Sequence, residues 1–341
     1  MRHRKMLLGT VLALAAGTLA MDTTTPADAD ADAVVVGAAD VGPTDAGPTD
    51  AGLADAGLAD VGLADAGSAA APGAGSLGAG SPGVGSPGAA ARPGATAGRN
   101  HAAPDTFYGR AFDTCQAPAV DTMRRWLASD YGAVGVYFGG RGRACADQKH
   151  LSREWLGSVD DMGWRVLPLY VGSQSPCVMA KNKQHVRIGD KPWEQGTREG
   201  ADAVNKAEEM GIAPESPLYL DMEAYRYKQQ DCAKTTLSFV RAWNREVRRH
   251  NYVPGFYSSA NSGVTHMDEA RREGVQDLPA VMWFARWHTA PDLNGEPALG
   301  RDAWQPHSRI HQYAGNVTER HGGRTITIDR NLVDAPVATL G

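Results

Sequence analysis

Eight short apolar runs, each about as long as a β-strand, recur along residues 105–341 and most constrain the fold of this chain. They lie at Tyr108–Phe112, Ala133–Phe138, Arg165–Val171, Pro217–Leu220, Val253–Tyr257, Ala280–Ala285, Arg309–Tyr313 and Thr325–Ile328. Helical patterns separate the early runs, whereas Gly/Pro-rich loops join the last ones. Strands that alternate with helices predict an α/β domain built on a parallel sheet.

Five segments between the runs space their apolar residues as helices do. They are Val120–Leu127, Leu151–Val159, Ala201–Gly211, Leu237–Asn251 and Thr265–Glu273. Eight strands with about five helices favour a TIM-like (β/α) barrel whose last strands lack helices. A doubly wound open sheet is the alternative. No glycine-rich phosphate loop follows the first run, which counts against a nucleotide-binding version of that sheet.

The N-terminal residues have the pattern of an export signal. A basic start at Met1–Lys5 precedes the apolar run Met6–Ala20, which is short for a bilayer span, and small residues follow it. We therefore expect residues 1–29 to be a signal peptide and the protein to be secreted, with no stable membrane span after cleavage. An uncleaved membrane anchor is the alternative.

Residues 30–104 are rich in Asp, Gly, Ala and Pro and contain no aromatic residue. Asp recurs every five residues from Asp40 to Asp65. Such a stretch has too little large apolar surface to offset its chain entropy, so we expect a disordered spacer. A pentapeptide solenoid is the alternative, but small Ala and Gly would occupy its inward positions. The barrel domain is expected at 105–341.

The charge of the folded part is balanced. The whole chain has a net charge of −5, and ten Asp lie between residues 22 and 65. Residues 101–341 hold 29 acidic and 29 basic residues. Nucleic-acid binders carry clustered basic surface, so no nucleic-acid partner is expected. We expect a monomer.

The hexapeptide Leu218–Glu223 predicts a buried strand that ends in two acids. Because side chains alternate along a strand, Tyr219, Asp221 and Glu223 share one face. Two buried acids on one face are costly unless they have a partner or a function. Glycoside hydrolysis uses such a carboxyl pair. The alternative is a structural network in which Arg or backbone N–H groups satisfy the acids.

Two further acids stand at the ends of predicted strands. Asp113 ends the first strand, and Asp329 is expected to end the eighth, which closes against the first. Active sites of β/α barrels lie at the C-terminal ends of the strands, so all four acids should meet at one rim. We expect Glu223 to be the general acid, because an apolar rim would raise its pKa. Asp221 would stabilise positive charge on the sugar, with Asp113 and Asp329 as electrostatic partners.

Aromatic side chains fall at or near the same strand ends. Flat rings with polar tips suit the faces and edges of sugars, although core packing is the alternative for any single ring. The candidate substrate-binding residues are Tyr170, Tyr219, Tyr257, Trp283, Trp287, Gln312 and Tyr313. Tyr257 and Trp287 are favoured because they fall latest in their strands.

One cysteine follows each of the first four strands. The four are Cys115, Cys145, Cys177 and Cys232. An even number in an exported chain favours two disulfides, with three pairings open. Loops of neighbouring strands are closest, which favours Cys115–Cys145 and Cys177–Cys232. A zinc site is the alternative, but no close Cys or His spacing supports a metal ligand set.

Six motifs in order, from about residue 107 to 335, resemble the family 25 glycoside hydrolases, secreted lysozymes that cut peptidoglycan. The motifs are Gly109–Asp113, Asp221–Glu223, Pro254–Ser258, Trp283–Trp287, His311–Gly315 and Ile328–Asn331. Thr114–Gln116 and Tyr137–Gly140 depart from that family. These departures are more similar to a related group, the secreted actinobacterial glycoside-hydrolase-like domain of unknown function. The resemblance implies an eight-stranded barrel with an acidic cleft.

Three functions follow from these patterns. The first is a secreted glycoside hydrolase that acts on a peptidoglycan-type glycan by carboxylate acid/base catalysis, without cofactor or metal. The second is a non-catalytic glycan-binding barrel associated with the cell wall. The third is a structural wall protein whose acids are paired with Arg and shielded from solvent. The complete set of carboxylates favours the first.

Overall fold

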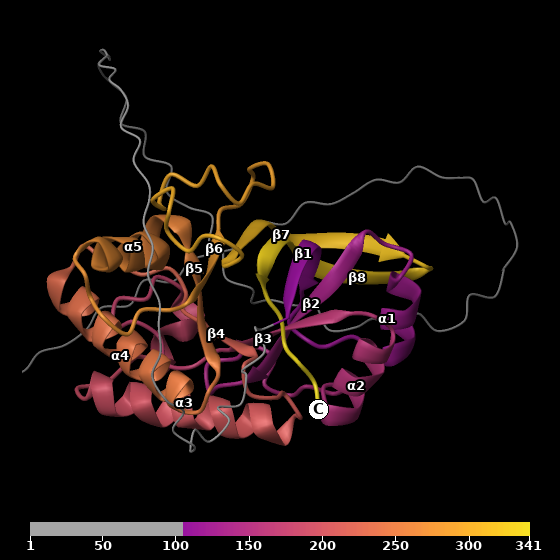
Figure 1. Ribbon diagram of the computed structural model, residues 1–341, viewed down its shortest axis with the longest axis horizontal. Coiled ribbons are helices and arrows are strands. Elements are labelled where there is room, and N and C mark those ends of the chain that lie inside the picture. The colour runs from indigo at the N-terminus through magenta and orange to yellow at the C-terminus, as the bar shows by residue number, and fades with distance from the viewer. Residues whose placement is uncertain (1–104) are drawn as a thin grey trace, which may run out of the picture. The chain divides into compact units, whose positions relative to one another are not determined.

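The computed structural model describes residues 105–341, and in this part the chain forms a closed barrel of eight strands (Figure 1). The strands are β1 (Thr106–Asp113), β2 (Tyr131–Gly139), β3 (Arg165–Tyr170), β4 (Pro217–Asp221), β5 (Val253–Ser259), β6 (Val281–Ala285), β7 (Arg309–His321) and β8 (Arg324–Pro336). Neighbours in the chain are neighbours in the sheet, and β8 closes on β1. The predicted barrel is confirmed. The signal peptide and the spacer predicted for 1–29 and 30–104 lie outside the described residues.

Five α-helices of the described part lie outside the barrel and follow strands β1 to β5 (Figure 1). They are α1 (Val120–Trp126), α2 (Arg153–Asp161), α3 (Pro192–Glu209), α4 (Gln230–Arg249) and α5 (Thr265–Arg272). Local sequence sets their starts: the Ser152 hydroxyl accepts the Trp155 N–H, and Pro192 occupies the first turn of α3. All five were predicted. The 3₁₀ helix η1 (Lys181–Val186) and the π-helical turn η2 (Ala260–Val264) were not.

Strand β8 runs antiparallel to both of its neighbours, whereas β1 to β7 are parallel to one another. The cause is the two-residue turn Gly322–Gly323, whose φ values of 53° and 84° suit a tight hairpin. The prediction that Asp329 ends its strand is therefore wrong, because Asp329 lies in the middle of β8. It still pairs in register with Asp113 at the end of β1, so both acids reach the same level of the barrel.

Buried side chains pack on both sides of the strands. Tyr219, Leu169 and Ile310 belong to the group that fills the barrel interior. Leu218 and Leu220 belong to the group between the strands and the helices. The predicted alternation of the hexapeptide is thus confirmed. Full burial of each such leucine contributes about 1.5–3 kcal/mol. This contribution strongly fixes which side chains of β4 point into the barrel and which point toward the helices.

Two disulfides tie segments that follow neighbouring strands; three of the cysteines lie in loops, and Cys232 lies in the first turn of α4. Cys115 is bonded to Cys145, and Cys177 to Cys232, which are the pairs that the sequence favoured. They close chain segments with sequence separations of 30 and 55 residues. In the part of the chain that the structure covers, no helix has the length and apolar character needed to cross a bilayer.

Candidate active site

A pocket opens where the parallel strands end, and it holds about 500 Å³ of space, part of it open to solvent. Its walls are Cys115, Tyr137, Arg143, Ala144, Cys145, Val171, Lys183, Asp221, Glu223, Tyr257, Trp287 and Asp329. Three of the four predicted acids line it directly. The fourth, Asp113, accepts a hydrogen bond from the hydroxyl of Tyr137, which lines the pocket.

Asp113 is held at the end of β1 by three hydrogen-bond donors. Its Oδ1 accepts the Tyr137 hydroxyl at 2.7 Å, and its Oδ2 accepts the side-chain amides of Gln312 at 3.0 Å and Asn331 at 2.8 Å. Burial raises the pKa of Asp113, and these bonds oppose the rise because they favour the charged form. Asp113 is therefore a fixed carboxyl beneath the pocket.

Asp329 shares the environment of Asp113. Its Oδ1 accepts the backbone N–H of Asn316 at 2.7 Å, and the Gln312 amide lies 3.4 Å from its Oδ2. Burial, together with the charge of Asp113, raises the pKa of Asp329 to about 8. Two adjoining carboxyls in a dry site are costly to ionise together, which favours a proton shared between them.

Asp221 at the end of β4 has the fewest hydrogen-bond and ion-pair partners of the four acids. It is 4% exposed, and its Oδ1 has no hydrogen-bond partner among the described residues. Burial raises its pKa to about 8; the neighbouring Glu223 charge adds to the rise, and the Lys183 charge opposes it. An unpaired buried carboxyl oxygen is costly, so Asp221 lowers the stability of the fold in this position.

Glu223 follows β4 and faces a cation. The Lys183 Nζ from η1 lies 3.9 Å from its Oε1. Burial raises the pKa of Glu223, while the Lys183 charge lowers it. The segment is fixed from its backbone: the Gln174 side chain accepts the Glu223 N–H at 2.8 Å and donates to the Asp221 carbonyl at 2.9 Å.

Gln312 joins both sides of the pocket. Its Oε1 accepts the Tyr257 hydroxyl and the Trp287 indole N–H, each at 2.9 Å. Its amide nitrogen donates to Asp113 and points at Asp329. Because these polar groups are used internally and the residue is 1% exposed, the contacts fit a positioning residue rather than the substrate contact expected from sequence.

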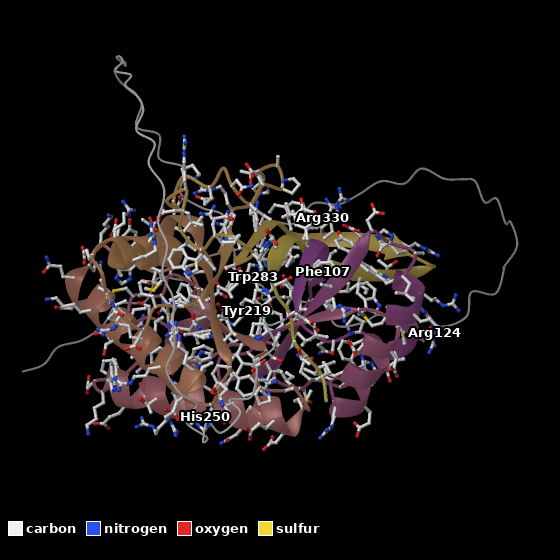
Figure 2. The ribbon with its side chains drawn as sticks, in the orientation of Figure 1. Phe107, Arg124, Tyr219, His250, Trp283 and Arg330 are labelled. Carbon is white, nitrogen blue, oxygen red and sulfur yellow. A yellow bond between two sulfur atoms is a disulfide. The ribbon has the colours of Figure 1, made fainter. Side chains whose placement is uncertain are left out.

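Two of the predicted aromatic residues, Tyr257 and Trp287, line the pocket, and both donate a hydrogen bond to Gln312. Tyr219 and Trp283 instead lie in the barrel interior, near the centre of the view in Figure 2. Tyr219 donates to the Pro336 carbonyl and Trp283 to the Asn331 side chain. Their register places them deeper than the strand ends.

Tyr170 and Tyr313 face away from the pocket. Tyr170 packs between sheet and helices, and its hydroxyl donates to Asp202 of α3 at 2.7 Å. Tyr313 is partly buried and packs beside His311, outside the pocket lining. Each directly follows an inward residue, Leu169 or Gln312, so alternation turns its ring outward.

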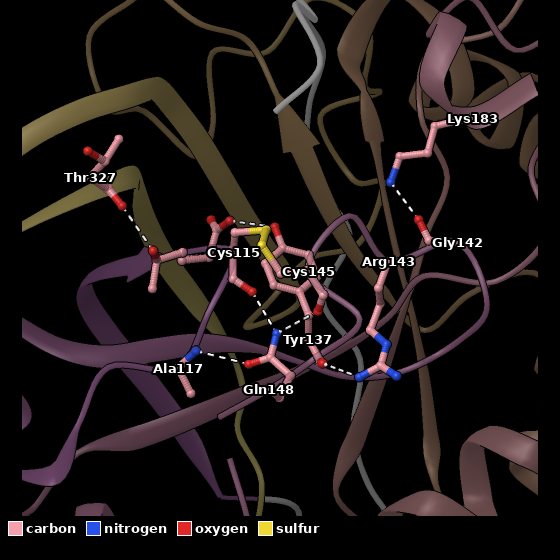
Figure 3. The surroundings of a disulfide bond; sticks show 11 residues. Cys115, Ala117, Tyr137, Gly142, Arg143, Cys145, Gln148, Lys183 and Thr327 are labelled. Carbon is pink, nitrogen blue, oxygen red and sulfur yellow. Dashed lines mark hydrogen bonds between the residues drawn. A yellow bond between two sulfur atoms is a disulfide. The ribbon is translucent and has the colours of Figure 1, made fainter. Parts of the chain in front are cut away.

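The Cys115–Cys145 disulfide forms part of the pocket wall (Figure 3). The Gln148 amide donates to the carbonyls of both cysteines, at 2.7 and 3.0 Å. Arg143 also lines the pocket, but its guanidinium bonds to the backbone carbonyls of Gly140 and Tyr137. This loop is therefore fixed by covalent and hydrogen bonds.

Sequence reasoning missed several residues of the site, above all Tyr137, Lys183 and Gln174. Tyr137 could have been found, because it alternates with the inward Ala133 and Gly135. Lys183 and Gln174 lie between β3 and α3 in a stretch without periodic pattern. Within residues 105–341, no group of three or more His, Cys, Asp or Glu side chains could hold a metal ion.

The fold and the acidic pocket define a glycoside-hydrolase-like barrel. The family described as "Rv2525c-like, glycoside hydrolase-like domain" matches residues 124–333, more than half of the chain, and the chain belongs to this family. No curated protein matches the chain.

Solved structures with related folds were also found. The Tat-secreted protein Rv2525c of Mycobacterium tuberculosis, in complex with L-tartrate, is 16% identical with a TM-score of 0.46, over 67% of this chain and 96% of that chain. The spore cortex lytic enzyme SleM of Clostridium perfringens is 9% identical with a TM-score of 0.45, over 67% of each chain. The modular autolysin LytC of Streptococcus pneumoniae is 10% identical with a TM-score of 0.41, over 68% of this chain and 46% of that chain.

Proposed function

We propose that this protein is a secreted glycoside hydrolase that cuts a peptidoglycan-type glycan of the cell wall by carboxyl acid/base catalysis. One observation carries the proposal: Asp221 and Glu223 face the same pocket, and burial raises the pKa of both. A pair in which one carboxyl keeps a proton while the other is charged is what glycoside hydrolysis requires.

In the proposed reaction, the protonated carboxyl of the pair gives its proton to the glycosidic oxygen as the bond from that oxygen to the sugar carbon breaks. Water adds to the sugar carbon and gives up a proton to the carboxylate, which restores one proton to the pair. Asp113 and Asp329 supply negative potential beside the positively charged sugar. The sequence favoured Glu223 as the proton donor, but the contact with Lys183 favours the charged form of Glu223.

Tyr257 and Trp287 are the proposed sugar-binding surface. Both line the pocket, and both donate to the same oxygen of Gln312, so their rings are held in one arrangement. Close approach of the Trp287 ring requires Gly315 on β7, where a Cβ atom would stand 2.1 Å from the indole. Rings with polar tips suit the apolar faces and hydroxyl edges of sugars.

Export and wall association belong to the same proposal. Two disulfides in the described part fit an oxidising compartment, and the basic and apolar N-terminus fits a signal peptide at 1–29. We propose that residues 30–104 serve as a spacer between the wall or membrane surface and the barrel domain at 105–341, which acts as a monomer.

The alternative is a glycan-binding barrel without turnover. It is favoured by the extent to which Asp113 and Glu223 are already compensated, by three donors and by Lys183 respectively. A structural role with arginine-paired acids has no support from the contacts: in residues 105–341, none of the hydrogen bonds or ion pairs described for the four acids involves an arginine.

Product analysis separates the two candidates. The mature protein is incubated with purified peptidoglycan, and soluble fragments are identified by mass spectrometry while bound protein is measured by co-sedimentation. Fragments with new reducing ends support the hydrolase. Co-sedimentation without fragments from any wall glycan would transfer the proposal to the binding barrel.

A further inference from the structure

Lys183 is a buried cation in the wall of the pocket. It lies in η1, is 6% exposed, and its Nζ donates to the Gly142 carbonyl at 2.8 Å (Figure 3). The carbonyl cannot move freely, because the Gly142 N–H donates in turn to Val171. A buried ammonium is costly without a partner, and the anion beside it is Glu223 at 3.9 Å.

The two acids of the Asp-x-Glu segment are therefore unequal. The Lys183 charge lowers the pKa of both acids, but its ion pair is with Glu223, whereas the buried Asp221 Oδ1 has no hydrogen-bond partner in the described part. Both line one pocket and interact electrostatically, and two like charges in one buried site are costly to carry together. The negative charge of the pair is therefore more stable on Glu223, which forms the ion pair with Lys183.

Other charged and titratable groups that face the pair come from several elements. They are Asp113 of β1, Tyr137 of β2, Tyr257 of β5, Asp329 of β8 and Arg143 of the loop after β2. Burial keeps both tyrosines neutral by raising their pKa well above the ordinary value. The Arg143 guanidinium is bonded to backbone carbonyls. Lys183 is thus the cation whose charge lowers the pKa of the pair.

We infer that Lys183 is a positioning residue that holds the negative charge of the pair on Glu223 and leaves the shared proton on Asp221. This inference rests on the proposed function for its role in catalysis, but the division of the proton is a property of the free protein. The raised pKa of Asp221, about 8, agrees with it. It reverses the assignment favoured by sequence: Asp221 becomes the proton donor, and Glu223 the carboxylate that takes a proton from water.

The test is a carboxyl carbon NMR titration of the folded protein labelled with ¹³C, which needs no substrate. In the wild type, Glu223 is expected to ionise at lower pH than Asp221. In Lys183→Met, the midpoint of Glu223 should rise by about one to three pH units, because a close positive charge is lost. Lys183→Arg should restore most of the wild-type difference. Lys181→Met, an exposed site in the same short helix, is the matched control and should change neither midpoint.

Two results would overturn the inference: a wild-type protein in which Asp221 ionises before Glu223, or a Glu223 midpoint that Lys183→Met leaves in place. If Lys183→Met does not fold, Glu223→Gln serves instead. Removal of the neighbouring charge must then lower the Asp221 midpoint, and an unchanged midpoint overturns the inference. A confirmed titration with no cleavage of any glycan would sink the proposed function and leave the proton division standing.

Discussion

The Asp221→Asn variant should change the sign of its effect on stability with pH. Burial and the Glu223 charge raise the pKa of Asp221 from 3.8 to about 8 in the folded protein. Folding is therefore unaffected by this group below pH 4, and stability is lost progressively as pH rises from about 4 to 8. At about 1.4 kcal/mol per pH unit, the full loss above pH 8 is on the order of 6 kcal/mol, shared with the coupled acids.

The asparagine cannot ionise, so this loss disappears in the variant. The new amide N–H groups are buried at a position where Oδ1 already has no hydrogen-bond partner, at a cost of about 1–3 kcal/mol. Asp221→Asn should therefore destabilise the protein at pH 4 and stabilise it by about 2 kcal/mol or more at pH 8. Urea unfolding at pH 4, 6 and 8 measures the difference, with the exposed Asp190→Asn as control. A stability difference that does not vary with pH would refute the reasoning.

Three further predictions follow from the pocket walls. Gln312→Leu should destabilise the fold by about 2–4 kcal/mol and weaken glycan binding, because it leaves Tyr257, Trp287 and two carboxyls without their common partner; urea unfolding and co-sedimentation measure both effects. Replacement of Cys115 and Cys145 by alanine should cost about 3–4 kcal/mol of stability for a closed segment of 30 residues, and also weaken glycan binding. Removal of the second disulfide, which does not line the pocket, should lower stability alone; equal loss of binding in both variants would count against the wall role. Gly315→Ala should displace the Trp287 indole and shift its fluorescence, and an unchanged spectrum would contradict that packing.

The sequence predicted the barrel because its signals were local and repeated. Alternation in the hexapeptide placed Tyr219 and Asp221 on one face and the two leucines on the other without knowledge of any distant contact, and the structure turns the leucines outward. The same rule, applied to Tyr170 and Tyr313, would have turned both away from the pocket. Their place at strand ends predicted a position in the pocket, but their register in the strands turns both rings outward.

What the sequence left out depends on contacts between loops. Lys183 reaches Glu223 only because the Gly142 carbonyl holds its ammonium, and these three residues belong to loops after three different strands. No pattern within one segment carries that information. Asp329 was placed at the correct rim for the wrong reason: a glycine hairpin reverses β8, and pairing with Asp113 sets its level.

The most direct test of the proposed hydrolase compares turnover and binding in the same assay. Reducing ends released from purified peptidoglycan are measured for the wild type, Asp221→Asn and Glu223→Gln, with Asp190→Asn as control. If the pair performs acid/base catalysis, each pair variant loses about 10²–10⁴-fold in turnover while co-sedimentation with the glycan persists. Turnover at the wild-type rate in Asp221→Asn or Glu223→Gln would contradict the central claim. So would a wild-type protein that binds the glycan but does not cut it.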